Sequence, residues 1–72
     1  MNRQQQICVY EIYRLGEPMD FKAIADKRKI AHGTVLGVLE YLKRIGIVYE
    51  LQYAEGVYDL TASGRREAEA ME

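Results

Sequence analysis

The segment from residue 20 to residue 48, DFKAIADKRKIAHGTVLGVLEYLKRIGIV, constrains the fold more than any other part of the chain. Apolar residues recur in it at helical spacing on both sides of a short break around Ile30. They are Ile24 and Ala25 before the break, and Val35, Leu39 and Leu42 after it. Asp20 is a favourable N-cap residue, and Gly46 suits the left-handed position that follows a helix. We therefore expect two helices, Phe21–Arg28 and a second from residue 31 or 32 to residue 45, joined by a tight turn.

Downstream of this segment, the sequence predicts a β-hairpin and a last helix. Residues 47–53 and 57–60 are rich in Val, Tyr and Leu and enclose a Gly-containing loop, which is the pattern of two short paired strands. Thr61 or Ser63 can cap a short helix that extends to Met71. The expected fold class is α+β, mostly α, in a single domain over the whole chain.

Upstream, apolar residues at helical spacing predict a helix over Arg3–Leu15. Its apolar arc spans well over half of the circumference, which is more than one small core needs. The residues opposite this arc mark the expected solvent side; they are Gln4, Glu11 and Arg14. Tyr10 and Tyr13 form a surplus flank of the arc. They either pair with a second copy of the chain, which predicts a homodimer through this helix, or cover the hairpin and the last helix.

These elements together resemble the winged helix-turn-helix family, and in particular small transcriptional regulators of the MarR and PadR groups. The residues that carry the resemblance are the Ile24-Ala25 pair, Ile30, the Thr34-Val35 pair, Gly46 and the run YDLTASGR over residues 58–65. The resemblance implies a three-helix helix-turn-helix core, a two-stranded wing over residues 48–60 and a short C-terminal helix. It also implies that the second helix of the motif enters the major groove of duplex DNA.

The charge distribution favours a polyanionic partner, although the formal net charge of the chain is −1. Residues 20–48 include six basic and three acidic residues, so this segment carries +3 and the remainder carries −4. Five of the basic residues are expected to contact phosphates: Lys27, Arg28, Lys29, Lys43 and Arg44. The alternative is that these charges only solvate two helix faces.

The outward face of the second helix of the motif supplies the other DNA-binding candidates. They are His32, Gly33, Thr34, Leu36 and Gly37, next to Glu40 and Tyr41. Thr34 and the free N–H groups at the helix start suit a phosphate, and Leu36 suits a thymine methyl group. His32 either reaches a base edge or a phosphate, or is only a cap or surface residue. Because Arg, Asn and Gln are absent from this face, we expect modest sequence selectivity.

Gly33 and Gly37 need a reason, because each glycine inside a helix costs about 1 kcal/mol relative to Ala. Either DNA or a partner protein approaches the bare backbone there, or the glycines make room for a neighbouring loop. The predicted hairpin carries Glu50 and Glu55, whose carboxylates repel phosphate, and Tyr53, which suits a protein contact. The rival hypothesis is therefore a winged-helix protein–protein interaction module that docks through this helix.

Composition argues against several other classes of protein. One Cys and one His do not make a metal ligand set, and Cys8 and His32 lie on different predicted helices, so we expect no metal, no cofactor and no enzyme activity. Cys8 lies on the apolar stripe of its helix and is expected to be a small buried hydrophobe. A lone cysteine, no signal-peptide pattern and no membrane span together predict a cytoplasmic protein without a membrane partner. No ligand-sensing pocket is expected in so short a chain.

Overall fold

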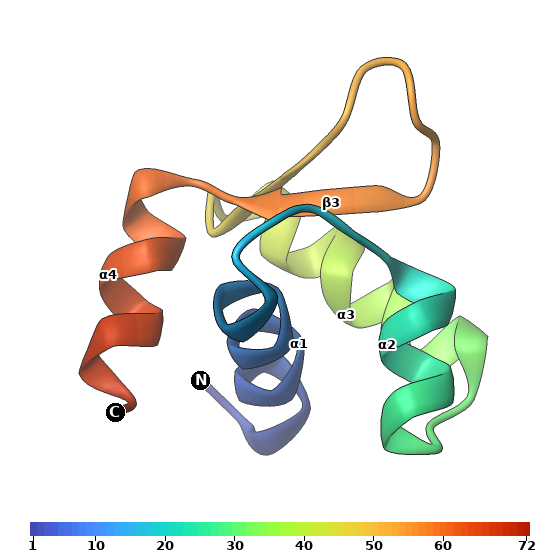
Figure 1. The fold of residues 1–72 in the computed structure, drawn as a ribbon, viewed down its shortest axis with the longest axis horizontal. Helices are drawn as coiled ribbons and strands as arrows, with labels where there is room; N and C mark the ends of the chain where they lie inside the picture. The colour runs from blue at the N-terminus through green and yellow to red at the C-terminus, as the bar shows by residue number, and fades with distance from the viewer.

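The computed structural model describes all 72 residues and has four helices and a three-stranded antiparallel sheet. The elements in chain order are α1 (Arg3–Leu15), β1 (Met19–Asp20), α2 (Phe21–Arg28), α3 (His32–Arg44), β2 (Val48–Glu50), β3 (Val57–Leu60) and α4 (Ala62–Ala70). Helix α1 lies at the centre, with α4 on one flank and α2 and α3 on the other, and the sheet lies across one end of the helices (Figure 1). The predicted class, α+β and mostly α, is confirmed.

The helices begin where local side chains satisfy their free N–H groups. Asn2 and Gln5 form a capping box at α1, in which Asn2 Oδ1 accepts from the Gln5 N–H at 2.9 Å. Asp20 Oδ1 accepts from the Lys22 N–H at 2.7 Å, which confirms the predicted N-cap of α2. Thr61, rather than Ser63, caps α4. The predicted bounds of α1 and α2 are both confirmed.

The turn between α2 and α3 contains the one non-glycine residue with a positive φ. Lys29 has φ 57° and ψ 46°, so it ends α2 in the left-handed conformation that usually favours glycine. Helix α3 then begins at His32, and its last helical residue is Arg44, one residue before the predicted end. Gly46 has φ +80°, as predicted for the residue that follows the helix.

The sheet contains a strand that the sequence did not predict. Its strand order is β1-β3-β2, and β1 pairs with β3 through Met19 opposite Tyr58. Two residues are too few to show the alternating pattern of a strand, so β1 can be recognised only from its pairing with β3. The predicted hairpin is confirmed, but β2 is shorter than expected, and the chain leaves the ladder after Glu50.

The core lies where α1, α2 and α3 meet the inner face of the sheet. Its largest fully buried side chains are Tyr58, Ile12, Ile24, Leu39 and Leu42. Cys8 is buried in the same cluster, as predicted, and burial raises the pKa of its thiol to about 11 despite the nearby Arg28 charge. The thiol is therefore protonated at neutral pH.

Helix α4 joins the core through small residues and a close backbone contact. Ala68 is buried, and Gly64 packs so closely on the hairpin that an added Cβ would overlap the carbonyl oxygen of Ile47. Thr61 Oγ1 donates to the Gly46 and Ile47 carbonyl oxygens at 2.6 and 3.0 Å. The inward face of α4 therefore includes Gly64 and Ala68. No helix is both long enough and apolar enough to span a bilayer.

Candidate nucleic-acid interface

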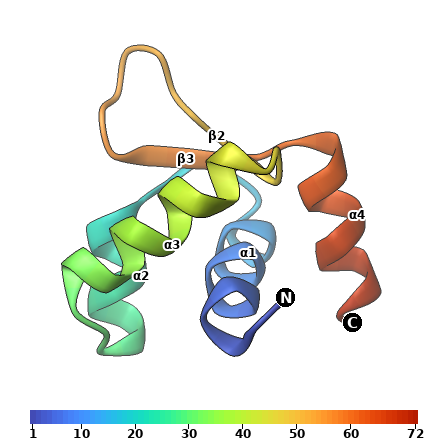
Figure 2. The same cartoon turned by 180° about the vertical axis from the view of Figure 1, so that it is seen from behind.

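Helix α3 buries one side and leaves its outer face open. Its inner side packs into the core through Val35, Leu39 and Leu42. Figure 2 shows α3 from the back of the molecule. Its outer face is formed by Gly33, Thr34, Gly37, Tyr41 and Arg44, all of which are exposed. A Cβ at Gly33 or Gly37 would meet no atom within 4 Å, so these glycines do not make room for a neighbouring loop of the chain.

The start of α3 is held by side chains of α2 and keeps free backbone donors. His32 Nε2 lies 2.7 Å from Asp26 Oδ1, and the His32 ring meets the Phe21 ring edge-on at 6.2 Å between centroids. The N-cap residue Ala31 offers no side-chain acceptor, and the first two N–H groups of α3, those of His32 and Gly33, have no acceptor within the chain. These donors and the positive end of the helix dipole suit an anion such as a phosphate.

Leu36 is less available than the other predicted contact residues. It is half-buried and packs against the core, so only part of its side chain faces outward. It lines a shallow cleft with Phe21 and Glu40 between α3, α2 and the hairpin. A contact between Leu36 and a thymine methyl group stays a prediction.

The helical spacing of α1 predicts that Glu11 faces solvent, and this prediction is wrong because Glu11 is buried. Its side chain is only 2% exposed, and two cations of α2 lie against its carboxylate. Lys27 Nζ lies 2.9 Å from Glu11 Oε1, and Arg28 Nε lies 2.6 Å from Glu11 Oε2. A helical wheel assumes that a charged residue faces water, and nothing in α1 itself shows that two cations from a later helix cover this one.

The two cations determine the charge state of Glu11. Burial alone would raise its pKa, but the hydrogen bonds and positive charges of Lys27 and Arg28 outweigh burial, so the pKa of Glu11 is lowered. The carboxylate is therefore ionised at neutral pH and buried, whereas its two counter-ions still reach solvent. Two of the five predicted phosphate-binding residues are thus already paired within the chain.

Lys43 is paired as well, at the junction of α3 and the hairpin. Its Nζ lies 3.1 Å from Glu40 Oε2 and 3.0 Å from Glu50 Oε1. Glu40 also accepts from the buried Tyr58 hydroxyl at 2.5 Å, and this hydrogen bond and the one from Lys43 lower its pKa. Glu50 accepts from the Gly56 N–H at 2.8 Å, so its carboxylate closes the hairpin loop. The Glu50 carboxylate therefore has a structural role, and Lys43 offsets its charge.

The unpaired cations of residues 20–48 lie along the edges of α2 and α3. Lys29 in the turn and Arg44 at the end of α3 are exposed and form no ion pair. Lys22, which the sequence did not single out as a contact residue, is exposed near the start of α2, with its Nζ 5.8 Å from the centroid of the Phe21 ring. These three cations and the free donors of α3 can attract a polyanion without first breaking an internal contact.

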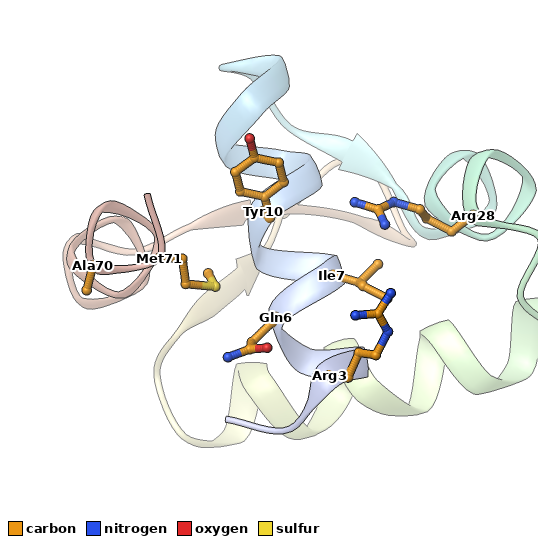
Figure 3. A pocket seen from close by; sticks show the side chains of 7 residues that line it. All are labelled: Arg3, Gln6, Ile7, Tyr10, Arg28, Ala70 and Met71. Atoms are coloured by element: carbon orange, nitrogen blue, oxygen red, sulfur yellow. The ribbon is translucent and has the colours of Figure 1, made fainter.

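The two predicted dimer residues occupy different environments on α1. Tyr10 is half-buried and lines a shallow groove of about 460 Å³ between α1 and the end of α4 (Figure 3). The groove is also lined by Arg3, Gln6, Ile7, Arg28, Ala70 and Met71. Tyr13 packs against the core instead. Of the pair, Tyr10 is therefore the better placed for a contact with a second copy of the chain.

No protein-family model and no curated protein matches this sequence. No group of three or more His, Cys, Asp or Glu side chains in the structure is arranged to hold a metal ion. A functional interpretation therefore depends on the geometry and charge of α2, α3 and the hairpin.

Proposed function

We propose that this chain is a small winged-helix DNA-binding protein that regulates transcription by occupying duplex DNA. The observation that carries the proposal is the open outer face of α3, bare at Gly33 and Gly37 and bordered by the unpaired cations Lys29 and Arg44. The succession of α2, a tight turn, α3 and a hairpin supports it, because this is the order of a helix-turn-helix followed by a wing.

The bare backbone permits a close approach of α3 to the floor or wall of the major groove. Phosphates would bind at the α3 N-terminus through Thr34 and the free N–H groups, and at the two ends through Lys29 and Arg44. Arg44, in the last turn of α3, has the paired donors that bind a guanine edge. Selectivity is expected to be modest, because the other outer-face residues are glycine, threonine and tyrosine.

The hairpin would contribute little to phosphate binding. Its tip carries Tyr53, which is 93% exposed, and Glu55, and it has no Lys or Arg. Glu50 is already held by Lys43 and Gly56. Contacts to DNA would therefore come mainly from α2 and α3.

A salt titration of binding to random-sequence duplex DNA tests the proposal. The three unpaired cations Lys22, Lys29 and Arg44 should together contribute roughly −2 to −3 to the slope of log K against log salt, since each phosphate contact contributes about −0.9. Lys29→Gln and Arg44→Gln should each remove about 0.9 from the slope. Arg66→Gln on α4, on the opposite flank of α1, is the matched control and should leave it nearly unchanged. Absence of binding at low salt would contradict the proposal.

Two exposed apolar side chains favour a second candidate function, a protein–protein interaction module. Tyr41 on α3 and Ile45, the C-cap residue that follows α3, are 42% and 47% exposed. They lie one helical turn apart and would anchor a partner helix. Gly37→Arg separates the candidates, because a new cation should strengthen DNA binding and steepen its salt slope but abolish docking of a protein against α3.

We further propose that the protein forms a homodimer through α1, with Tyr10 in the interface. A chain of this size buries a limited core, and the groove beside Tyr10 leaves part of α1 uncovered. Sedimentation should show a dimer at micromolar concentration, and Tyr10→Glu should convert it to a monomer. Gln4→Glu, on the exposed side of the same helix, is the control. If Tyr10→Glu leaves the mass unchanged in a folded protein, the interface lies elsewhere.

A further inference from the structure

The ion-pair triad of Glu11, Lys27 and Arg28 joins the central helix to the helix that precedes the candidate DNA-contacting helix. We infer that Glu11 is an internal counter-ion that competes with DNA phosphates for Lys27 and Arg28 and so limits the affinity of the α2–α3 surface for DNA. This inference rests on the proposed DNA-binding function and assigns a residue that sets its strength.

Each oxygen of the Glu11 carboxylate holds a different cation. Oε1 accepts from Lys27 at 2.9 Å and Oε2 accepts from Arg28 Nε at 2.6 Å. Both cations still reach solvent, since the Lys27 and Arg28 side chains are 54% and 31% exposed. Arg28 binds Glu11 through Nε alone, and its two terminal nitrogens form no hydrogen bond within the chain. A phosphate can therefore approach either cation from outside while Glu11 holds it from inside.

The burial of Glu11 favours Glu11 over a phosphate as the partner of at least one of the two cations. If both cations turned fully to phosphates, a carboxylate that is 2% exposed would be left charged and without a partner, which is strongly unfavourable. At least one cation must therefore stay with Glu11 in any complex. The triad has a net charge of +1, so it offers DNA one effective cation rather than two.

The same geometry distinguishes Glu11 from the other carboxylates of the chain. Asp26 lies on the same helix as the cations, but it is exposed and faces His32. The carboxylates nearest Lys43, Glu40 and Glu50, are held by Tyr58 and Gly56 as well as by the lysine. Glu11 alone is both fully covered and bound only by cations that belong to the proposed DNA-binding segment.

Glu11→Gln, compared with Glu67→Gln, tests the inference in the full chain. Both variants remove one negative charge, but Glu67 is exposed on α4, on the opposite flank of α1. On random-sequence duplex DNA, Glu11→Gln should steepen the salt slope by about 0.9, because one further cation becomes free to contact phosphate. Between 200 and 50 mM salt, the affinity of Glu11→Gln should therefore rise about 3.5-fold more than that of wild type. Glu67→Gln should keep the wild-type slope.

Lys27→Gln, alone and combined with Glu11→Gln, supplies a second arm of the test. In the wild-type background it should lower the slope by about 0.9, because Arg28 then stays with Glu11 and the triad no longer offers DNA a cation. In the Glu11→Gln background it should remove the gain in slope. Lys29→Gln, the neighbouring unpaired cation, should cost the full 0.9 in both backgrounds.

The outcomes separate the inference from the function on which it rests. If the wild type binds DNA but Glu11→Gln has the slope of Glu67→Gln, or if adding Glu11→Gln to Lys27→Gln does not restore the lost slope, the counter-ion role is wrong and DNA binding stands. A folded Glu11→Gln that binds more weakly also overturns the inference, because Glu11 would then position the cations. If neither the wild type nor any variant binds at low salt, the proposed function and the inference both fail.

Discussion

On one flank of α1, helix α4 meets the hairpin by direct backbone contact, whereas on the other flank α2 is tied to α1 by ion pairs and α3 keeps its outer face open. Both flanks carry glycines inside helices, yet Gly64 is pressed against Ile47 while Gly33 and Gly37 face open space. The difference shows that the same residue type in the same secondary structure serves close packing at one site and exposure at another.

The two arrangements should differ in how a substitution changes the free energy of unfolding. A close backbone contact cannot yield to an added methyl group without moving an element, so the α4 flank should be intolerant of substitution. On an open helix face an added side chain displaces no neighbour. Glycines there lower the stability of the helix, and no packing contact offsets this loss. A surface that is maintained at a cost to stability is a reasonable site for function.

The largest effect on stability is expected from a substitution at the contact between α4 and the hairpin. Gly64→Ala should lower the free energy of unfolding by about 3 kcal/mol, because its Cβ would overlap the Ile47 carbonyl oxygen and α4 would have to shift from the hairpin. Urea denaturation measures the change. Ser63→Ala, the exposed neighbour in the same helix, should stay within about 0.5 kcal/mol of wild type. A Gly64→Ala protein as stable as wild type would show that the contact is loose.

An intermediate effect concerns the ion pairs on the other flank. Because the folded-state pKa of Glu11 lies below its unfolded value of about 4.3, its contribution to stability is present above that pH and is lost as pH falls through the folded pKa. Glu11→Gln should cost about 1–2 kcal/mol at neutral pH, less than for a triad closed to solvent, since Lys27 and Arg28 can be hydrated.

Denaturation at a series of pH values checks this second prediction. The difference in unfolding free energy between wild type and Glu11→Gln should shrink below about pH 4.3. Part of the acid sensitivity should persist in the variant, because hydrogen bonds from Tyr58 and from Gly56 lower the pKa of Glu40 and of Glu50 in the same direction. A difference that is independent of pH would mean that Glu11 contributes by packing rather than by charge.

The smallest expected effect has the opposite sign and concerns the open face of α3. Gly37→Ala should raise the free energy of unfolding by up to about 1 kcal/mol, because the added methyl group meets no atom within 4 Å and improves helix propensity. Thermal or urea denaturation measures the gain. If DNA approaches α3 at this point, the more stable variant should bind duplex DNA less tightly than wild type. A loss of stability would show that Gly37 is a packing residue after all.

Local sequence was sufficient to predict the helices and most of their ends, although α3 and α4 each end one residue earlier than predicted. Asp20, Gly46 and the apolar spacing of α1, α2 and α3 act over one or two turns, so their effects are visible without knowledge of the fold. The burial of Cys8 was predictable for the same reason, since it lies on the apolar stripe of its own helix. The open face of α3 and the positive charge of residues 20–48 could likewise be proposed as a candidate site from the sequence.

Contacts between elements decided the rest. Strand β1 exists only because Met19 and Asp20 lie beside β3, and the role of Gly64 depends on a hairpin that arrives from elsewhere. The tertiary structure also decided which cations of the candidate site are free, by placing Lys27 and Arg28 over Glu11 and Lys43 between Glu40 and Glu50. The composition gives the number of charges but not their partners. The pairs that Glu11 forms with Lys27 and Arg28 join residues that are far apart in the sequence, so they depend on how the whole core places α2 relative to α1.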